Sequence, residues 1–161
     1  MEPVLLHVLV GPPGGGKTTY ARDAFAANWI VSADDIREAM TRWRRDDPVA
    51  TWKYVVPVKQ KVARAMARAI EERLQAGLPT VYDNTNLLQR NRRSLLKLVP
   101  KGVRVRYVVI DRPLAAKLAD RGWRPARLIA QQHAMFQTEL PAILAGDRCE
   151  FVSVEDRRVL R

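Results

Sequence analysis

Short apolar runs alternate with amphipathic stretches along the whole chain. Five runs have the length of strands, at 4–10, 29–31, 79–82, 103–110 and 149–154. The stretches between them place apolar residues at helical spacing, which predicts helices at 17–27, 34–43, 58–75, 88–98, 113–120 and 125–144. This alternation predicts an α/β fold, with a parallel sheet of about five strands and helices on both faces.

Local signals refine these elements. Ser32 is expected to cap the helix that follows it, and Gly77 to end the helix at 58–75. The polar stretch 44–51 contains a proline and is read as a loop. In the run 103–110, arginines alternate with apolar residues at the start, which predicts a strand near a sheet edge with one face partly solvated.

The segment behind the first apolar run has the pattern G-x-x-x-x-G-K-S/T of a phosphate-binding loop, between a strand and a helix. Its glycines let the backbone wind closely around a triphosphate, and the helix start adds the positive end of a dipole. Lys17 is expected to reach the β- and γ-phosphates, and the Thr18 hydroxyl to ligate Mg²⁺. The expected ATP-binding residues are Gly11, Gly14, Gly15, Gly16, Lys17, Thr18 and Thr19. A glycine-rich turn before an ordinary helix is the plain alternative.

Size and composition limit the class of protein. The chain has 161 residues, which predicts one phosphate-loop domain over 1–161. No run approaches the ~18 apolar residues of a membrane helix, and no signal-peptide pattern opens the chain. We therefore expect a cytoplasmic protein with no membrane partner. The single cysteine, Cys149, cannot form an internal disulfide, and the oligomeric state is left open.

The chain is strongly basic, with a net charge of +11. Between residues 86 and 138 twelve Lys and Arg stand against two acids, so most of the excess lies there. This charge predicts a polyanionic partner, and DNA or RNA is the expected acceptor. A solvated basic surface in an arginine-rich proteome is the alternative.

Polar residues follow the predicted strands at the edge where ligands of parallel sheets bind. Asp34 and Arg37 share a helix face, so a carboxylate could take a proton from an attacking hydroxyl while the guanidinium holds a neighbouring phosphate. Alternatively, Asp34 only favours the helix dipole and Arg37 is solvated. Asp35 beside them is a further candidate for substrate contact.

The third strand ends in Asp83, where phosphate-loop proteins keep an acid that orients Mg²⁺. Asn84, Thr85 and Asn86 supply short polar side chains that can line the cleft, and the first two are expected to contact substrate. A turn rich in capping residues is the alternative, most of all for Asn86.

Phosphoryl transfer also needs cations around the migrating group, carried by a segment that closes over the nucleotide. The lid is expected at about 113–127, with Arg121 as its catalytic arginine and Arg124 as a second ATP ligand. Trp123 is either a stacking platform or a packing anchor. The cation-rich stretches around Trp43 and Trp52 suit single-stranded nucleic acid, and core packing of Trp43 is the alternative.

Together these residues resemble the phosphate-loop 5′-hydroxyl polynucleotide kinases of phage and bacterial end-healing systems. The similarity runs from residue 4 to about 140, in the order phosphate loop, D-x-x-R, D-N-T-N-L and arginine lid. The resemblance implies that Asp34 is the general base for the 5′-hydroxyl and that Arg37 grips the acceptor's adjacent phosphate. It also implies that Arg121 clasps the β- and γ-phosphates.

The chain departs from that family at two points. The family's aspartate before the Thr-Asn pair is replaced by Asn84, and the acid stands one residue earlier at Asp83. Because Asp34 and Asp35 are adjacent, both are candidates for the general base. We expect an ATP- and Mg²⁺-dependent kinase of a 5′-hydroxyl on DNA or RNA. A kinase of a hydroxymethylpyrimidine in phage DNA, a small-metabolite kinase and a non-catalytic ATP-binding module are the alternatives.

Overall fold

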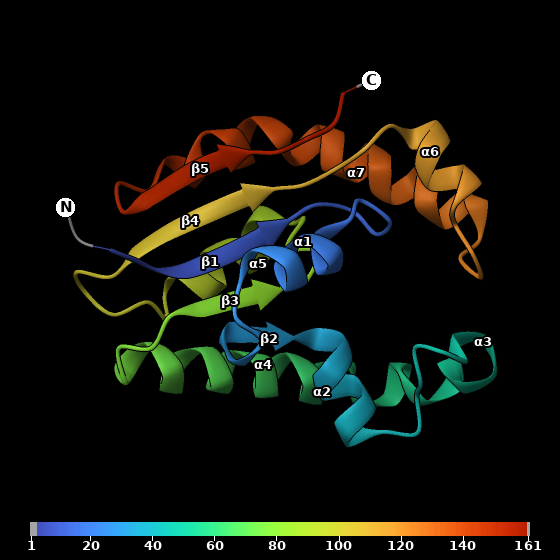
Figure 1. Cartoon of the computed structure of the whole chain (residues 1–161), viewed down its shortest axis with the longest axis horizontal. Helices are drawn as coiled ribbons and strands as arrows, with labels where there is room; N and C mark the ends of the chain where they lie inside the picture. The colour runs from blue at the N-terminus through green and yellow to red at the C-terminus, as the bar shows by residue number, and fades with distance from the viewer. Residues whose placement is uncertain (1–2, 161) are drawn as a thin grey trace.

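The computed structural model describes residues 3–160 and contains one five-stranded parallel sheet. Its strands are β1 (Val4–Val10), β2 (Ile30–Ser32), β3 (Thr80–Asp83), β4 (Arg104–Val109) and β5 (Val152–Asp156). They lie in the order β2-β3-β1-β4-β5 (Figure 1). All four neighbouring pairs are parallel, so the predicted α/β class is confirmed.

Helices connect these strands. They are α1 (Lys17–Ala24), α2 (Ala33–Met40), α3 (Pro48–Thr51), α4 (Lys59–Gln75), α5 (Gln89–Leu96), α6 (Leu114–Ala119) and α7 (Ala126–Leu144). Single 3-10 turns are η1 (Ala27–Trp29), η2 (Trp52–Tyr54), η3 (Val56–Val58) and η4 (Gly146–Arg148). Within the described residues, no helix combines the length and the apolar character that crossing a membrane requires.

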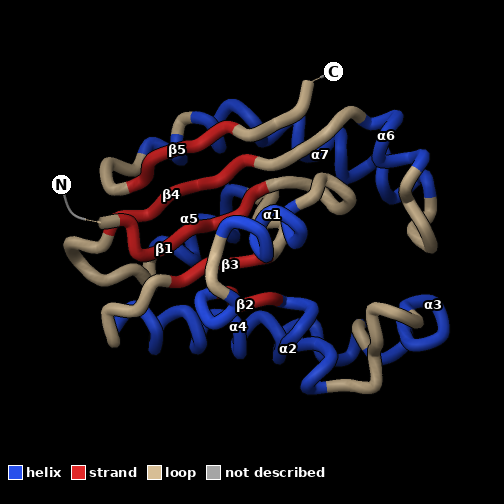
Figure 2. The backbone as a smooth tube through the Cα atoms, viewed as in Figure 1, coloured by secondary structure: helices blue, strands red, loops and turns tan. Residues whose placement is uncertain are grey.

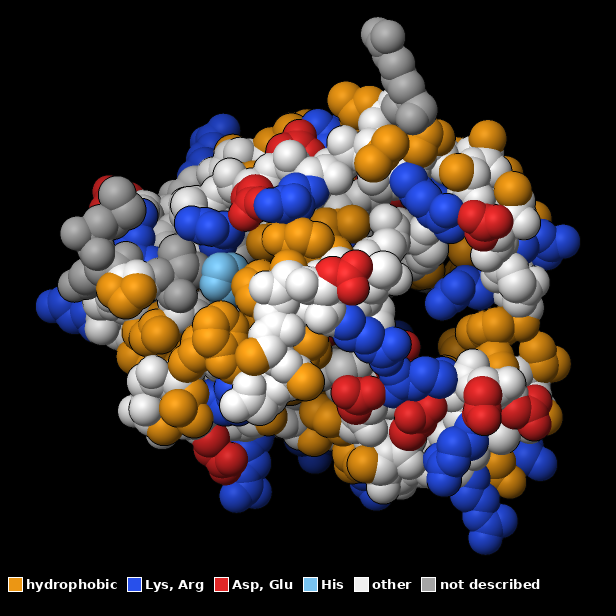
Figure 3. Space-filling model, viewed as in Figure 1, with side chains coloured by type: hydrophobic (Ala, Val, Ile, Leu, Met, Phe, Trp, Pro, Cys, Tyr) orange, Lys and Arg blue, Asp and Glu red, His pale blue; other side chains and the backbone are white. Residues whose placement is uncertain are grey.

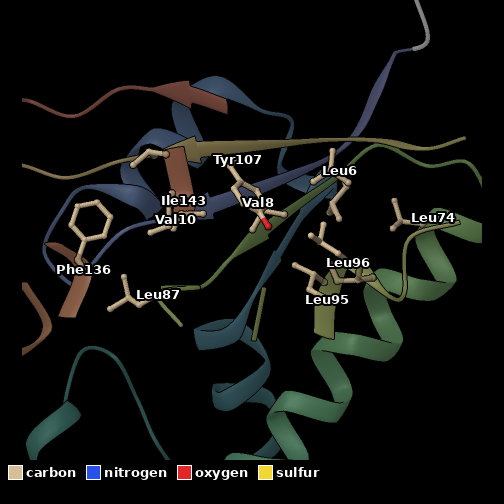
Figure 4. Packing of buried hydrophobic residues seen from close by; sticks show 13 residues of the cluster. Leu6, Val8, Val10, Leu74, Leu87, Leu95, Leu96, Tyr107, Phe136 and Ile143 are labelled. Atoms are coloured by element: carbon tan, nitrogen blue, oxygen red, sulfur yellow. The ribbon is translucent and has the colours of Figure 1, made fainter. Parts of the chain in front are cut away.

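Both faces of the sheet are covered, because successive side chains of a strand point to opposite faces. On one face Leu6, Val8 and Val10 of β1 pack with residues of α4, α5 and α7, as Figure 4 shows for the labelled side chains. On the other face Leu9 packs with Ala21 of α1 and with neighbouring strands. The pattern explains why six of the seven residues of β1 are apolar, with His7 as the exception.

Most element boundaries follow the local signals. The Ser32 side chain accepts a hydrogen bond from the Asp35 amide at 3.3 Å and so caps α2. Gly77 has φ +67°, and its amide donates to the Leu74 carbonyl at the end of α4. The helix expected at 17–27 ends earlier, at Ala24.

One expectation needs correction, and another is confirmed in part. The stretch read as a loop contains α3, because Pro48 occupies a first-turn position where its missing N–H costs nothing. The strand β4 lies near a sheet edge as expected, with β5 as the edge strand beside it. Arg104 and Arg106 at its start are half-buried as expected, but its last three residues are buried.

Parallel pairing places the carboxyl ends of all five strands at one edge of the sheet. Figure 2 shows the loops that follow β1 and β4 leaving this edge together, with α3 and α6 beyond it. Residues from distant parts of the chain therefore meet there.

Candidate functional site

A cavity of about 420 Å³ opens at the carboxyl edge of the sheet. Figure 3 shows a hollow on that side, with cationic, acidic and hydrophobic side chains around its rim. The phosphate loop, the start of α2 and the loop after β3 all contribute to the cavity, as the sequence predicted. The predicted site residues that line it are Gly14, Gly16, Lys17, Thr18, Thr19, Asp34, Arg37, Asp83, Asn84, Thr85 and Arg124.

The glycines of the phosphate loop have two different tasks. Gly14 and Gly16 line the cavity with φ +78° and +101°, a backbone region that favours glycine. Gly11 and Gly15 lie buried beneath, and a Cβ at Gly11 would stand 1.9 Å from the Ile110 carbonyl oxygen. These two glycines therefore let the loop pack on the end of β4. No side chain caps α1 within the described residues, so its first N–H groups can serve an anion.

Lys17 is buried at the start of α1, with its ammonium turned back to the loop. Its Nζ donates to the Pro12 carbonyl oxygen at 2.9 Å. Burial lowers the pKa of Lys17 to about 8, with Arg124 adding repulsion and Asp83 opposing the shift. A buried ammonium with so little compensation is suited to receive a phosphate.

Thr18 and Asp83 form a short oxygen cluster beside Lys17. The Thr18 hydroxyl donates to Asp83 Oδ2 at 3.0 Å. Burial raises the pKa of Asp83, and the Thr18 hydrogen bond and the charge of Lys17 offset only part of this. Mg²⁺ prefers hard oxygen ligands and takes one or two from the protein, with phosphates and water completing the set. The hydroxyl and the carboxylate fit such an ion.

Asp34 and Arg37 form an ion pair on the first turn of α2, at the cavity wall. The guanidinium of Arg37 also lies over the ring of Trp43, 5.2 Å from its centroid. Trp43 is 4% exposed, so the packing alternative for this residue is correct, although its ring also reaches the cavity wall. The aromatic ring and the carboxylate together hold Arg37 in place.

The two neighbouring aspartates face different surroundings. Asp34 lines the main cavity, whereas Asp35 pairs with Arg45 and borders an adjoining hollow of about 110 Å³ that shares Thr18 and Asp83 with the cavity. Arg45 also pairs with Glu38 and so ties α2 to the segment that follows it. Asp34 is thus the one of the two aspartates that lines the main cavity.

The arginines of the expected lid are also separated. Arg124 lines the cavity, whereas Arg121 is exposed outside it and donates to the Arg124 carbonyl oxygen at 3.1 Å. A role for Arg121 on the phosphates therefore requires the loop between α6 and α7 to move. Asn86 lies outside the cavity as well, because its side chain donates to the Leu9 carbonyl oxygen at 2.8 Å.

Sequence reasoning missed two cations at the phosphate loop. Arg112 Nε donates to the Gly14 carbonyl oxygen at 2.6 Å. Lys117 is buried against Gly14 and bonds Asp111 Oδ1 and His133 Nδ1, each at 2.8 Å. The available signal was their position after β4, whose carboxyl end meets the same edge as the other strands.

Comparison with known proteins agrees with this geometry. A family described as an AAA domain matches residues 6–137. Comparison with curated proteins found no match. A similar fold occurs in a sugar kinase from Janibacter sp. HTCC2649, with 22% sequence identity and a TM-score of 0.57. The similarity covers 96% of this chain and 86% of that chain.

Two other solved structures are similar. A chain of the Pnkp1/Rnl/Hen1 RNA repair complex has 20% identity and TM-score 0.66 over 91% of this chain and 46% of that chain. A gluconokinase from Sinorhizobium meliloti 1021 has 18% identity and TM-score 0.52 over 96% and 84%. At these identities the likeness concerns the fold. Because the family match spans most of the sequence, the chain belongs to the AAA domain family, with the fold of a phosphate-loop kinase.

Proposed function

We propose that this chain transfers the γ-phosphate of ATP to the 5′-hydroxyl of a DNA or RNA strand. One observation carries the proposal: a carboxylate and a guanidinium, Asp34 and Arg37, share one cavity with the phosphate loop and with an aromatic wall. The loop is suited to the donor, the ion pair to the reacting hydroxyl and its phosphate, and the aromatic wall to a base.

The donor half would hold the triphosphate. The N–H groups of α1 and the ammonium of Lys17 would bind the β- and γ-phosphates, and Lys17 would exchange the Pro12 carbonyl for a phosphate oxygen. Thr18 and Asp83 would hold Mg²⁺, which when bound neutralises charge on the phosphates. Arg124 lines the same space and adds a further positive charge.

The acceptor half would supply the base. The carboxylate of Asp34 accepts the proton of the 5′-hydroxyl as its oxygen bonds to the γ-phosphorus, while the bond to the β-phosphate oxygen breaks and ADP leaves. Arg37 keeps the acceptor's neighbouring phosphate in place. The work is positioning and charge stabilisation, because phosphoryl transfer asks little covalent chemistry of the protein.

The character of the wall favours nucleic acid over a sugar. Apolar and aromatic groups form part of the cavity wall beside its polar side chains, namely Trp43, Trp52, Val55, Trp123 and Leu128. Bases stack on aromatic rings, and this wall supplies such rings. The charge of +11 also suits a polyanion. Because the similar folds include sugar kinases and a chain of an RNA repair complex, the acceptor test includes both a sugar acid and nucleic acids.

An acceptor panel tests the proposal. The protein is incubated with γ-labelled ATP and, separately, a 5′-hydroxyl DNA, a 5′-hydroxyl RNA, a duplex containing hydroxymethylpyrimidine and gluconate. We expect label on the 5′ ends, and none on the same oligonucleotides with a 5′-phosphate. Label on gluconate or on the modified base alone would replace the proposed acceptor. ATP binding without transfer to any member would indicate a non-catalytic module.

A further inference from the structure

Two tryptophans from opposite sides of the cavity meet at its wall. Trp52 belongs to η2, which follows α2 and α3, and Trp123 belongs to the loop between α6 and α7. Their ring centroids are 5.6 Å apart and the rings are tilted by 51°. We propose that Trp52 and Trp123 form an aromatic clamp for the base of the acceptor's terminal nucleotide. This proposal rests on the proposed function.

Trp52 combines an exposed ring with a place in the cavity wall. Trp52 is 46% exposed although it lines the cavity, whereas Trp43 in the same wall is 4% exposed. Large apolar side chains left in solvent at a cavity mark surfaces that bind a partner. Trp43 therefore has a packing role in the cavity wall, whereas the exposed ring of Trp52 is accessible to a ligand.

Cations surround the aromatic pair. The guanidinium of Arg124 lies 5.6 Å from the ring centroid of Trp123, and Arg37 and Arg45 line the same cavity. Single-stranded nucleic acids bind where bases meet aromatic faces and phosphates meet cations. The clamp and the arginines together match a nucleotide, with the ring contacts on its base and the guanidinium groups on its phosphates.

The clamp is assigned to the acceptor because Trp52 shares its segment with the acceptor machinery. Asp34, Arg37 and Trp43 precede it in the same stretch between β2 and α4, and all of them line the cavity with it. A base held at this wall belongs to the nucleotide whose hydroxyl Asp34 would deprotonate. Trp52 lies in the short turn η2, between α3 and η3, and the clamp requires its ring to move away from Trp123 to admit a base.

The test compares Trp52→Ala and Trp52→Phe with Val56→Ala as the control. Val56 lies four residues after Trp52, is 69% exposed and does not line the cavity. Each protein is assayed on a 5′-hydroxyl oligonucleotide and on one with an abasic 5′-terminal nucleotide. We expect Trp52→Ala to raise KM for the normal oligonucleotide about 5- to 150-fold, the range of one base stacked on an aromatic ring. Trp52→Phe should recover most of the loss, and KM for ATP should not change.

The abasic oligonucleotide isolates the base contact. The wild-type protein should bind it as weakly as Trp52→Ala binds the normal one, and the substitution should cost nothing further. Equal losses on both oligonucleotides would overturn the clamp, and a loss confined to ATP would assign the rings to adenine instead.

Tryptophan fluorescence tests the clamp without relying on transfer. A 5′-hydroxyl oligonucleotide should quench the wild-type protein in the absence of ATP, and the abasic one should quench it much less. Equal quenching by the two would contradict the clamp. Failure of the proposed function appears differently, as an absence of label on every oligonucleotide in the acceptor panel. Trp123→Phe replaces Trp52→Ala if the latter does not fold.

Discussion

The protein buries charge in two regions that differ in how completely each charge is partnered. In the first region, Arg92 of α5 is 0% exposed. Its guanidinium makes two hydrogen bonds to Asp147, at 2.8 and 2.9 Å, and further ones to main-chain carbonyl oxygens. Tyr107 donates to the same carboxylate at 2.7 Å. In the cavity, Lys17 has one carbonyl oxygen as its hydrogen-bond partner among the described residues, and Asp83 has one hydroxyl.

The pKa shifts of the two carboxylates go in opposite directions. Burial alone would raise the pKa of Asp147, but the hydrogen bonds from Arg92 and Tyr107 outweigh it and the pKa is lowered. The pKa of Asp83 is raised, because burial exceeds the effect of its few partners. A fully partnered buried charge therefore holds the fold, whereas an under-partnered one marks the place for a ligand.

The largest effect should come from the fully partnered cluster. Asp147→Ala removes the buried carboxylate that Arg92 and Tyr107 share and leaves Arg92 with main-chain carbonyls and the more distant Glu139, which should cost about 3–5 kcal/mol of unfolding free energy. Asp156→Ala removes a carboxylate paired with Arg158 at the surface and should cost less than about 1 kcal/mol. Urea denaturation measures both. Similar losses for the two variants would mean that the buried cluster is not structural.

Lys17→Ala should have the reverse profile, a large loss of binding with no loss of stability. The missing charge-assisted bond should weaken ATP binding by about 1.5–3 kcal/mol, roughly 10- to 150-fold. The unliganded variant should unfold at the same temperature or higher, since burial disfavours the ammonium. Calorimetric titration and thermal melts test this, with exposed Lys61→Ala as the control. A clear fall in melting temperature would contradict the contrast.

ATP affinity should also depend on pH. The free protein releases the Lys17 proton near pH 8, so the dissociation constant for ATP should rise above that pH, approaching about tenfold per unit. The sign follows because only the ammonium attracts phosphate. Lys17→Ala should show a flat profile between pH 7 and 9. A flat wild-type profile over the same range would mean that the charge of Lys17 does not contribute.

Asp83→Asn should give the smallest change in stability. A carboxylate whose folded pKa is raised favours folding at low pH and loses that contribution as pH rises through the folded pKa. At pH 7 without nucleotide the asparagine variant should therefore melt slightly higher than the wild type. With Mg²⁺ and ATP at a hundredfold excess over Kd the wild type should gain about 2.7 kcal/mol, and the variant much less.

A matched surface variant, Asp46→Asn, controls for loss of a charge alone, because Asp46 is exposed. It should follow the wild type in both melts. Retention of the full Mg²⁺-dependent gain by Asp83→Asn would remove Asp83 from the metal site.

The donor half could be predicted from sequence because its chemistry is local. Strand β1, the phosphate loop and the start of α1 are contiguous, and β1 begins and ends where its apolar run predicts. Asp34 and Arg37 were found for the same reason, since a spacing of three on a helix places them together.

The rest of the site depends on contacts between distant segments. Sequence favoured Arg121, but the fold turns Arg124 to the cavity, and this depends on how one loop packs. The contact between Trp52 and Trp123 joins elements that no local pattern relates. Arg112 and Lys117 reach the phosphate loop only through the packing of the segment after β4 on Gly14, about 100 residues away in the chain, and no local pattern marks this contact.

The most direct measurement is transfer of label from γ-labelled ATP to a 5′-hydroxyl oligonucleotide by the wild type and by Asp34→Asn, with ATP affinity measured in parallel. Wild-type protein should label the oligonucleotide, and Asp34→Asn should be slower by about 10²- to 10⁴-fold, the usual contribution of a general base. Its ATP affinity should stay within a few fold of the wild type. No labelling by the wild type, or a rate for Asp34→Asn close to that of the wild type, would contradict a 5′-hydroxyl kinase with Asp34 as its base.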